Sequence, residues 1–154
     1  TSRDDFHHML SVLYNISTFS NVHKVLFEHG VFDMVDRILS SYVAKKMKLT
    51  SVESMDIPQY ETDTQMAIAM MNTFLNSPEG LSKVKNSDYV FGRIFLNLMK
   101  LGDNTRMITE CIHAIAVFSG FKCLMRFVAL ADVCRAVFTY LEEISMTSET
   151  AYDI

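Results

Sequence analysis

The sequence predicts an all-α protein built from repeated helical units, and three observations support this class. Apolar residues make up 49% of the 154 residues, whereas the chain contains only two prolines and five glycines. Apolar side chains recur at spacings of three and four along most of the chain, as on one face of an α-helix. Three stretches, residues 15–39, 72–98 and 116–141, also share one order of elements: the end of a long helix, a short helix, a corner and another long helix.

The first stretch shows why the chain is expected to turn where it does. The apolar face of its short helix is formed by Val22, Val25 and Leu26. Ser20 or Asn21 can cap this helix, because a side-chain oxygen there can accept a free backbone N–H group of the first turn. Gly30 is expected to end it, since glycine adopts the left-handed conformation without a Cβ clash. A long helix then continues to about Tyr42.

The other elements are predicted from the same two signals, capping side chains and apolar stripes. The expected helix starts are Ser2, Thr62, Ser77 before Pro78, Ser87–Asp88, Asn104 and Asp132. The expected long helices after Tyr42 end near Leu75, Gly102 and Gly120, a short one begins at Ser77–Pro78, and a short helix over 121–130 and a long one over 133–144 follow. We expect residues 43–60, with three lysines and a proline, to form an inserted loop that is helical in part at its start. We expect the polar residues 145–154 to fray.

The internal repeat is the strongest signal in the sequence. When Asn15, Asn72 and Ala116 are aligned, the next corner follows 15 or 16 residues later, and the apolar stripes of the long helices coincide. These stripes are Met34–Val35 with Ile38–Leu39, Ile94–Phe95 with Leu98–Met99, and Val137–Phe138 with Leu141. The last two aligned positions are 44 residues apart and the first two are 57 apart, an excess that fits the insertion. A period in the low forties is typical of stacked helical repeats that share one core.

The residues of the first stretch resemble a known repeat family. Asn15–Ile16–Ser17, the short apolar helix and Glu28–His29–Gly30–Val31 are similar to the armadillo repeat, with its "NLA" ending, short first helix and "AGGIP" corner. The resemblance covers about residues 4–42, 62–101 and 104–144, and the third window departs most from the family pattern. It implies one domain over residues 1–154, a right-handed α-solenoid of armadillo- or HEAT-like three-helix repeats. Because the chain lacks an initiator methionine, we expect it to be part of a longer protein.

The resemblance also implies a binding surface, since the third helices of such a solenoid line a concave groove for an extended peptide or a partner helix. The spacing maps this groove to His8, Ser11 and Asn15, to Gln65, Ile68 and Asn72, and to Thr109, Ile112 and Ala116. Asn15 and Asn72 would either hydrogen-bond a ligand or cap the exits of their helices, and Ile68 and Ile112 would act as aliphatic anchors. The chain has no tryptophan, so the importin-alpha-like mode of gripping a basic nuclear-localisation peptide is not expected.

Charge and motifs exclude several other classes of function. A net charge of −4 gives no support to a nucleic-acid or anionic-membrane partner, and no apolar run approaches the roughly 18 residues of a membrane span. Cys111, Cys123 and Cys134 are expected to be reduced core thiols of an intracellular protein, in the cytoplasm or nucleus. Cys111 and His113 would point to different helix faces, so we expect no metal. We also expect no cofactor and no enzymatic activity, since the sequence has no phosphate-binding glycine loop or nucleophile elbow.

The sequence therefore predicts a non-catalytic scaffold or adaptor that binds a protein partner during complex assembly. One alternative is a structural domain that self-associates as a homo-oligomer, or that stacks against further repeats. The last long helix favours this alternative because it is apolar over much of its circumference. Its expected stacking surface consists of Val133, Val137, Tyr140 and Leu141.

Overall fold

The computed structural model describes residues 3–48, 57–101 and 104–147. These residues form eight α-helices and two short 3₁₀-helices, with no strand among them, so the predicted all-α class is confirmed. The first four α-helices are α1 (Arg3–Ile16), α2 (His23–Glu28), α3 (Val31–Met47) and α4 (Ile57–Leu75). The last four are α5 (Pro78–Lys85), α6 (Phe91–Leu101), α7 (Thr105–Phe118) and α8 (Leu130–Thr147). The 3₁₀-helices are η1 (Ser20–Val22) and η3 (Lys122–Met125).

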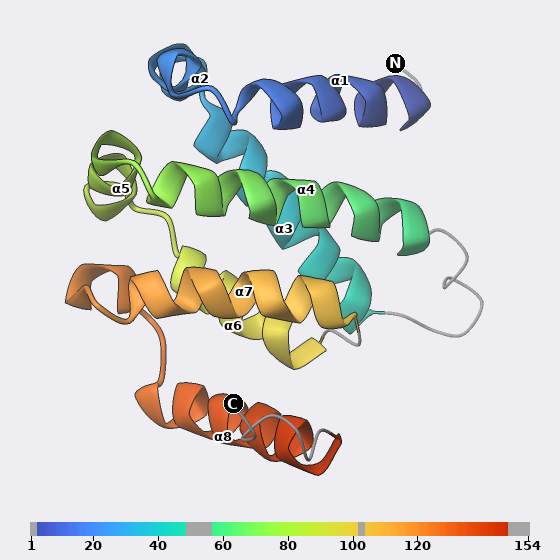
Figure 1. Ribbon diagram of the computed structural model, residues 1–154, viewed down its shortest axis with the longest axis vertical. Helices are drawn as coiled ribbons and strands as arrows, with labels where there is room; N and C mark the ends of the chain where they lie inside the picture. The colour runs from blue at the N-terminus through green and yellow to red at the C-terminus, as the bar shows by residue number, and fades with distance from the viewer. Residues whose placement is uncertain (1–2, 49–56, 102–103, 148–154) are drawn as a thin grey trace.

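The long helices are arranged in two layers (Figure 1). In one layer α4 lies between α1 and α7 and contacts both, and in the other α6 contacts both α3 and α8. The layers are joined because α3 packs on α4 and α6 packs on α7. The short helices α2 and α5 lie at one edge, on the left in Figure 1, whereas α1 and α8 lie at opposite ends of the long axis. The order short, long, long therefore occurs twice, as α2–α3–α4 and as α5–α6–α7.

Three predicted turn signals are confirmed by the local geometry. Gly30 joins α2 to α3 with a φ of 79°, the left-handed conformation that favours glycine. The Ser77 hydroxyl oxygen accepts the backbone N–H of Gly80 at 3.0 Å and caps α5. The Asn104 side-chain oxygen accepts the N–H of Met107 at 3.2 Å and caps α7. Each signal acts within a few residues, which is why sequence alone could identify it.

Other predicted helix starts are wrong. Thr62 lies inside α4, which begins five residues earlier, and Asp132 lies inside the first turn of α8. Neither η1 nor α2 has a side-chain cap, so Ser20 and Asn21 do not serve as predicted. The expected helix over residues 121–130 is reduced to the single 3₁₀ turn of η3, because the chain is diverted at Phe127, where φ is 61°.

Helices extend into both ends of the predicted inserted loop. The helix α3 continues to Met47, and α4 begins at Ile57. Packing between the two helices accounts for the extra turns: Tyr42 is buried, and the Lys45 ammonium lies 3.3 Å from the ring centroid of Tyr60. Residues 49–56, the expected helix end at Gly102 and the end of the expected tail, 148–154, lie outside the described residues.

The core of the fold is aromatic within the unit α2–α3–α4. Phe74 of α4 is fully buried, and its ring centroid lies 5.2 Å from those of His23 and Phe27 and 5.6 Å from that of Phe32. The buried His23 ring is also held by a 2.6 Å hydrogen bond between its Nε2 and the Ser17 carbonyl oxygen. This cluster joins α2, α3 and α4 and fixes the end of α1.

Candidate protein-interaction surfaces

The structure places the predicted groove residues on three neighbouring helices, α1, α4 and α7. Four of them are exposed: His8, Asn15, Thr109 and Ala116. Four are half-buried: Ser11, Gln65, Asn72 and Ile112. The ninth, Ile68, has no exposed surface and packs in the core, so it cannot be the predicted surface anchor. Ile68 is buried because α4 is covered by α1 and α7 on its two sides, whereas α1 has α4 alone beside it in its layer among the helices that the structure describes.

The two asparagines that the repeat aligns have different environments. The Asn72 amide nitrogen donates to the Glu110 carbonyl oxygen at 3.0 Å and to Glu110 Oε2 at 2.9 Å. Asn72 therefore ties α4 to α7, a role that was neither of the two expected. Asn15 is exposed at the end of α1, where its backbone carbonyl accepts from the Thr18 hydroxyl at 2.9 Å, and its side-chain amide makes no hydrogen bond within the described residues. Asn15 is thus the asparagine that a ligand could reach.

A polar contact that the sequence analysis missed joins α1 to α4 beside this surface. His7 Nδ1 lies 2.8 Å from Oδ1 of Asp63, whose side chain is buried. The Ser11 hydroxyl donates to the His7 carbonyl oxygen at 2.9 Å and lies 3.6 Å from the Met66 sulfur. These side chains hold the two helices together. A partner could therefore contact only the outer side of α1, which carries His8 and Asn15. No sequence signal paired His7 with a residue 56 positions away.

The second candidate surface lies on α8, at the opposite end of the molecule. Four residues of this helix form an exposed line, which we call the α8 apolar strip: Leu130, Cys134, Phe138 and Leu141. Phe138 is 64% exposed, whereas Phe95, its counterpart in the repeat, is fully buried. The difference arises because α7 covers α6, with the rings of Phe95 and Phe118 5.5 Å apart, and no described helix covers the same face of α8.

The predicted stacking residues only partly coincide with this strip. Val133, Val137 and Tyr140 are half-buried and pack against the core, so they hold α8 to the body of the protein. Leu141, at 46% exposure, is the predicted residue that belongs to the open surface. Leu130, expected at the end of a separate short helix, is instead the first residue of α8 and belongs to this surface.

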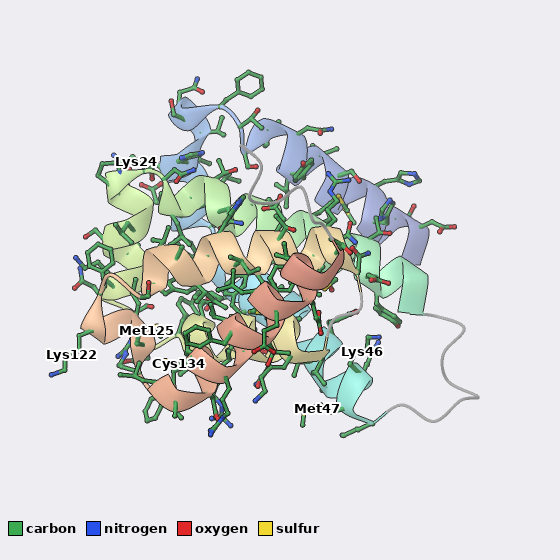
Figure 2. All side chains as sticks on the ribbon, turned by 60° about the horizontal axis from the view of Figure 1, so that its bottom comes forward. Lys24, Lys46, Met47, Lys122, Met125 and Cys134 are labelled. Atoms are coloured by element: carbon green, nitrogen blue, oxygen red, sulfur yellow. The ribbon has the colours of Figure 1, made fainter. Side chains whose placement is uncertain are left out.

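The loop between η3 and α8, residues 126–129, is held to the body of the protein at one residue and exposed to solvent at the next. The Arg126 guanidinium donates to the backbone carbonyl oxygens of Ser87 and Tyr89, between α5 and α6. The next residue, Phe127, has a φ of 61°, which is unusual for a bulky side chain, and its ring is 77% exposed. A shallow hollow of about 890 Å³ lies alongside, lined by Ser119, Lys122, Cys123, Met125, Arg126 and Leu130. In Figure 2, Lys122, Met125 and Cys134 lie on the same side of the molecule.

A second hollow, of about 400 Å³, separates the polar side of α8 from α6 and α7. Its walls include Asp132 and Arg135, which form an ion pair with an N–O distance of 2.6 Å. The hydrogen bond from Arg135 holds the pKa of Asp132 below its usual value. Both side chains are open to solvent, so the pair contributes little to stability. It neutralises Arg135, the arginine of α8.

The three cysteines differ in accessibility, and only Cys111 is a fully buried core thiol. Its burial, with a smaller contribution from the charge of Glu110, raises the pKa of the Cys111 thiol to about 12. A thiol must lose its proton before it can react, so Cys111 is protected in the folded state at neutral pH. Cys134 is exposed on α8, and therefore the expectation of a core position is wrong for this residue.

In dilute solution, where the chain is monomeric, we expect a maleimide at pH 7 to label Cys134 first and half-buried Cys123 more slowly. Cys111 should be labelled only when the chain unfolds, because both its burial and its raised pKa oppose reaction. Mass spectrometry of timed samples, with and without denaturant, measures the three rates. Labelling of Cys111 in the native protein at the rate of Cys134 would contradict the packing of α7 described above.

Comparisons of the chain with protein-family models, with curated proteins and with solved structures give no match. Within the described parts of the chain, no three His, Cys, Asp or Glu side chains gather where they could hold a metal ion. None of the helices described above combines the length and apolar composition needed to cross a membrane. The two surfaces, on α1, α4 and α7 and on α8, are the features of the described chain that bear on function.

Proposed function

We propose that this protein is a non-catalytic protein-interaction module whose helices form an armadillo-like right-handed α-solenoid. The order of elements supports the proposal, because α2–α3–α4 and α5–α6–α7 repeat the same short, long, long pattern. Equivalent helices of the two units are also neighbours: α4 contacts α7, and α3 contacts α6. Units that contact their neighbours in this way share one core and present an extended surface made of equivalent helices.

The observation that carries the proposal is the shared outer surface of α1, α4 and α7. The predicted groove residues that are exposed on it are small or polar, and they lie on its two outer helices, α1 and α7, with α4 between them (Figure 1): His8, Asn15, Thr109 and Ala116. A protein segment that crosses these helices could accept hydrogen bonds from the Asn15 amide and lie against the half-buried Ile112. Backbone hydrogen bonds of this kind give affinity for an extended segment with little demand on its sequence. The exposed free thiol of Cys134 fits a reducing, intracellular compartment.

We expect the double variant Asn15→Arg/Ala116→Arg to lose its protein partner, because two long cations would occupy both ends of this surface. A matched control is Ser40→Arg/Ala44→Arg, which places the same side chains at exposed positions of α3, in the other layer. Each protein serves as bait in a cell extract, captured proteins are quantified by mass spectrometry, and the leading partner is then titrated in purified form.

The expected result is a partner that binds the wild type and the α3 control equally and binds the α1/α7 variant at least tenfold more weakly, roughly the effect of blocking one interface hot spot. Thermal unfolding of all three proteins confirms that the fold is retained. If the α1/α7 variant captures the same partner with unchanged affinity, this surface is not the binding site.

A further inference from the structure

The α8 apolar strip has the geometry of a helix-pairing surface. Its four members, Leu130, Cys134, Phe138 and Leu141, are separated by four, four and three residues, so they lie on one face of the helix. The strip is about 16 Å long at the rise of an α-helix. Three of its side chains are among the most exposed large apolar residues of the described chain. A continuous apolar line of this kind marks an interaction site more often than scattered apolar residues do.

We propose that the α8 apolar strip binds the same strip of a second copy of this chain, with the two helices antiparallel about a twofold axis. This symmetry requires a surface that is complementary to itself. The strip meets the requirement, because an axis between residues 135 and 136 places Leu130 opposite Leu141 of the second copy. The same axis brings Cys134 and Phe138 of each copy to the middle of the interface, where an aromatic side chain contributes most to binding.

The charges at the two ends of the strip favour a second copy and an antiparallel orientation. Lys122 precedes the strip and lines the same hollow as Leu130, whereas Glu142 follows Leu141. Antiparallel pairing brings the acidic end of one helix to the basic loop before the helix of the other copy, and does so twice. Parallel pairing would bring like charges together. Arg135, the remaining cation beside the strip, is already paired with Asp132 of its own helix.

The first test is the mass of the 154-residue chain by analytical ultracentrifugation over a range of concentrations. We expect a monomer–dimer equilibrium, and we expect Phe138→Asp to raise the dimer dissociation constant by about 30-fold or more, as for an interface hot spot. The control is Phe19→Asp, since Phe19 is 61% exposed, close to the 64% of Phe138, and lies at the other end of the molecule. It should leave the dissociation constant unchanged. A wild type that stays monomeric at about 100 μM, or a Phe138→Asp variant that dimerises normally, overturns the proposal.

The second test concerns orientation and uses charge reversal. Glu142→Lys and Lys122→Glu should each weaken the dimer by about fivefold, because each substitution places like charges together at both ends of the interface. The double variant Glu142→Lys/Lys122→Glu should restore the dissociation constant to within about twofold of the wild type. Dimers that are weakened by the single changes and not restored by the double change exclude the antiparallel pairing. The variant Asn15→Arg/Ala116→Arg should dimerise normally. The partner-binding proposal and the dimer proposal can therefore be tested independently.

Discussion

Replacement of Phe74 by alanine is expected to lower the free energy of unfolding by about 4 kcal/mol, within the range for truncating a buried phenylalanine. The side chain is fully buried, and its ring packs between those of His23, Phe27 and Phe32. Because these rings belong to α2 and α3, the loss affects the contacts among three helices. The cavity cannot close easily, since each neighbouring ring is itself held by a second contact, such as the 5.1 Å stacking of Phe27 on Phe32.

Urea unfolding monitored by circular dichroism at 222 nm measures this change. Phe19→Ala is the control, because the Phe19 ring is 61% exposed and its loss should change the free energy of unfolding by less than about 0.5 kcal/mol. A loss of under about 1.5 kcal/mol for Phe74→Ala would mean that the aromatic cluster is not packed as described.

Features that depend on a few consecutive residues could be predicted from the sequence. The apolar stripes located the helices, and Gly30, Ser77 and Asn104 marked their corners because a cap acts within one turn. The end of α3 was misplaced at Tyr42 because the last turns depend on packing against α4, as in the contact of Lys45 with the Tyr60 ring. A polar segment can continue a helix when a neighbouring helix covers one side of it.

Features that depend on distant contacts could not be predicted. The sequence over residues 121–130 has enough apolar residues to suggest a helix, yet the chain is diverted by the hydrogen bonds from Arg126 to Ser87 and Tyr89, 39 and 37 positions earlier. Asn72 was expected on an open surface, whereas Glu110 of the next repeat satisfies its amide. Both errors have one cause, since the partner lies in another repeat and spacing within a repeat carries no information about it.

The candidate sites show the same limit. The stripe Val137–Phe138 with Leu141 matches Ile94–Phe95 with Leu98 in sequence, but within the described residues only the stripe on α6 is covered by a following helix. A repeat pattern therefore predicts which residues can pack, while exposure depends on whether a neighbour is present. For this reason the sequence correctly indicated that α8 has an uncovered apolar surface, but three of the four residues predicted to form this surface are half-buried.

Gly92→Ala is expected to destabilise the protein by about 3 kcal/mol, the upper part of the range for overpacking. A Cβ atom at this position of α6 would lie 2.5 Å from the Leu124 carbonyl oxygen of η3, which is too close for any normal contact. The clash involves backbone rather than a flexible side chain, so relief requires η3 to move away from α6. Because α8 follows directly from this loop, movement of η3 should also displace the α8 apolar strip.

The matched control for this substitution is Gly120→Ala, since a Cβ atom there would meet only the Val117 carbonyl oxygen, at 3.4 Å. Urea unfolding should show a loss for Gly92→Ala and little change for Gly120→Ala. Maleimide labelling adds a local readout: Cys123 lies in η3, so it should react faster in the Gly92 variant, while Cys111 in α7 remains protected. Equal stability of the two variants, with equal Cys123 labelling rates, would show that α6 does not hold η3 in place, and the anchored direction of α8 would then need another cause.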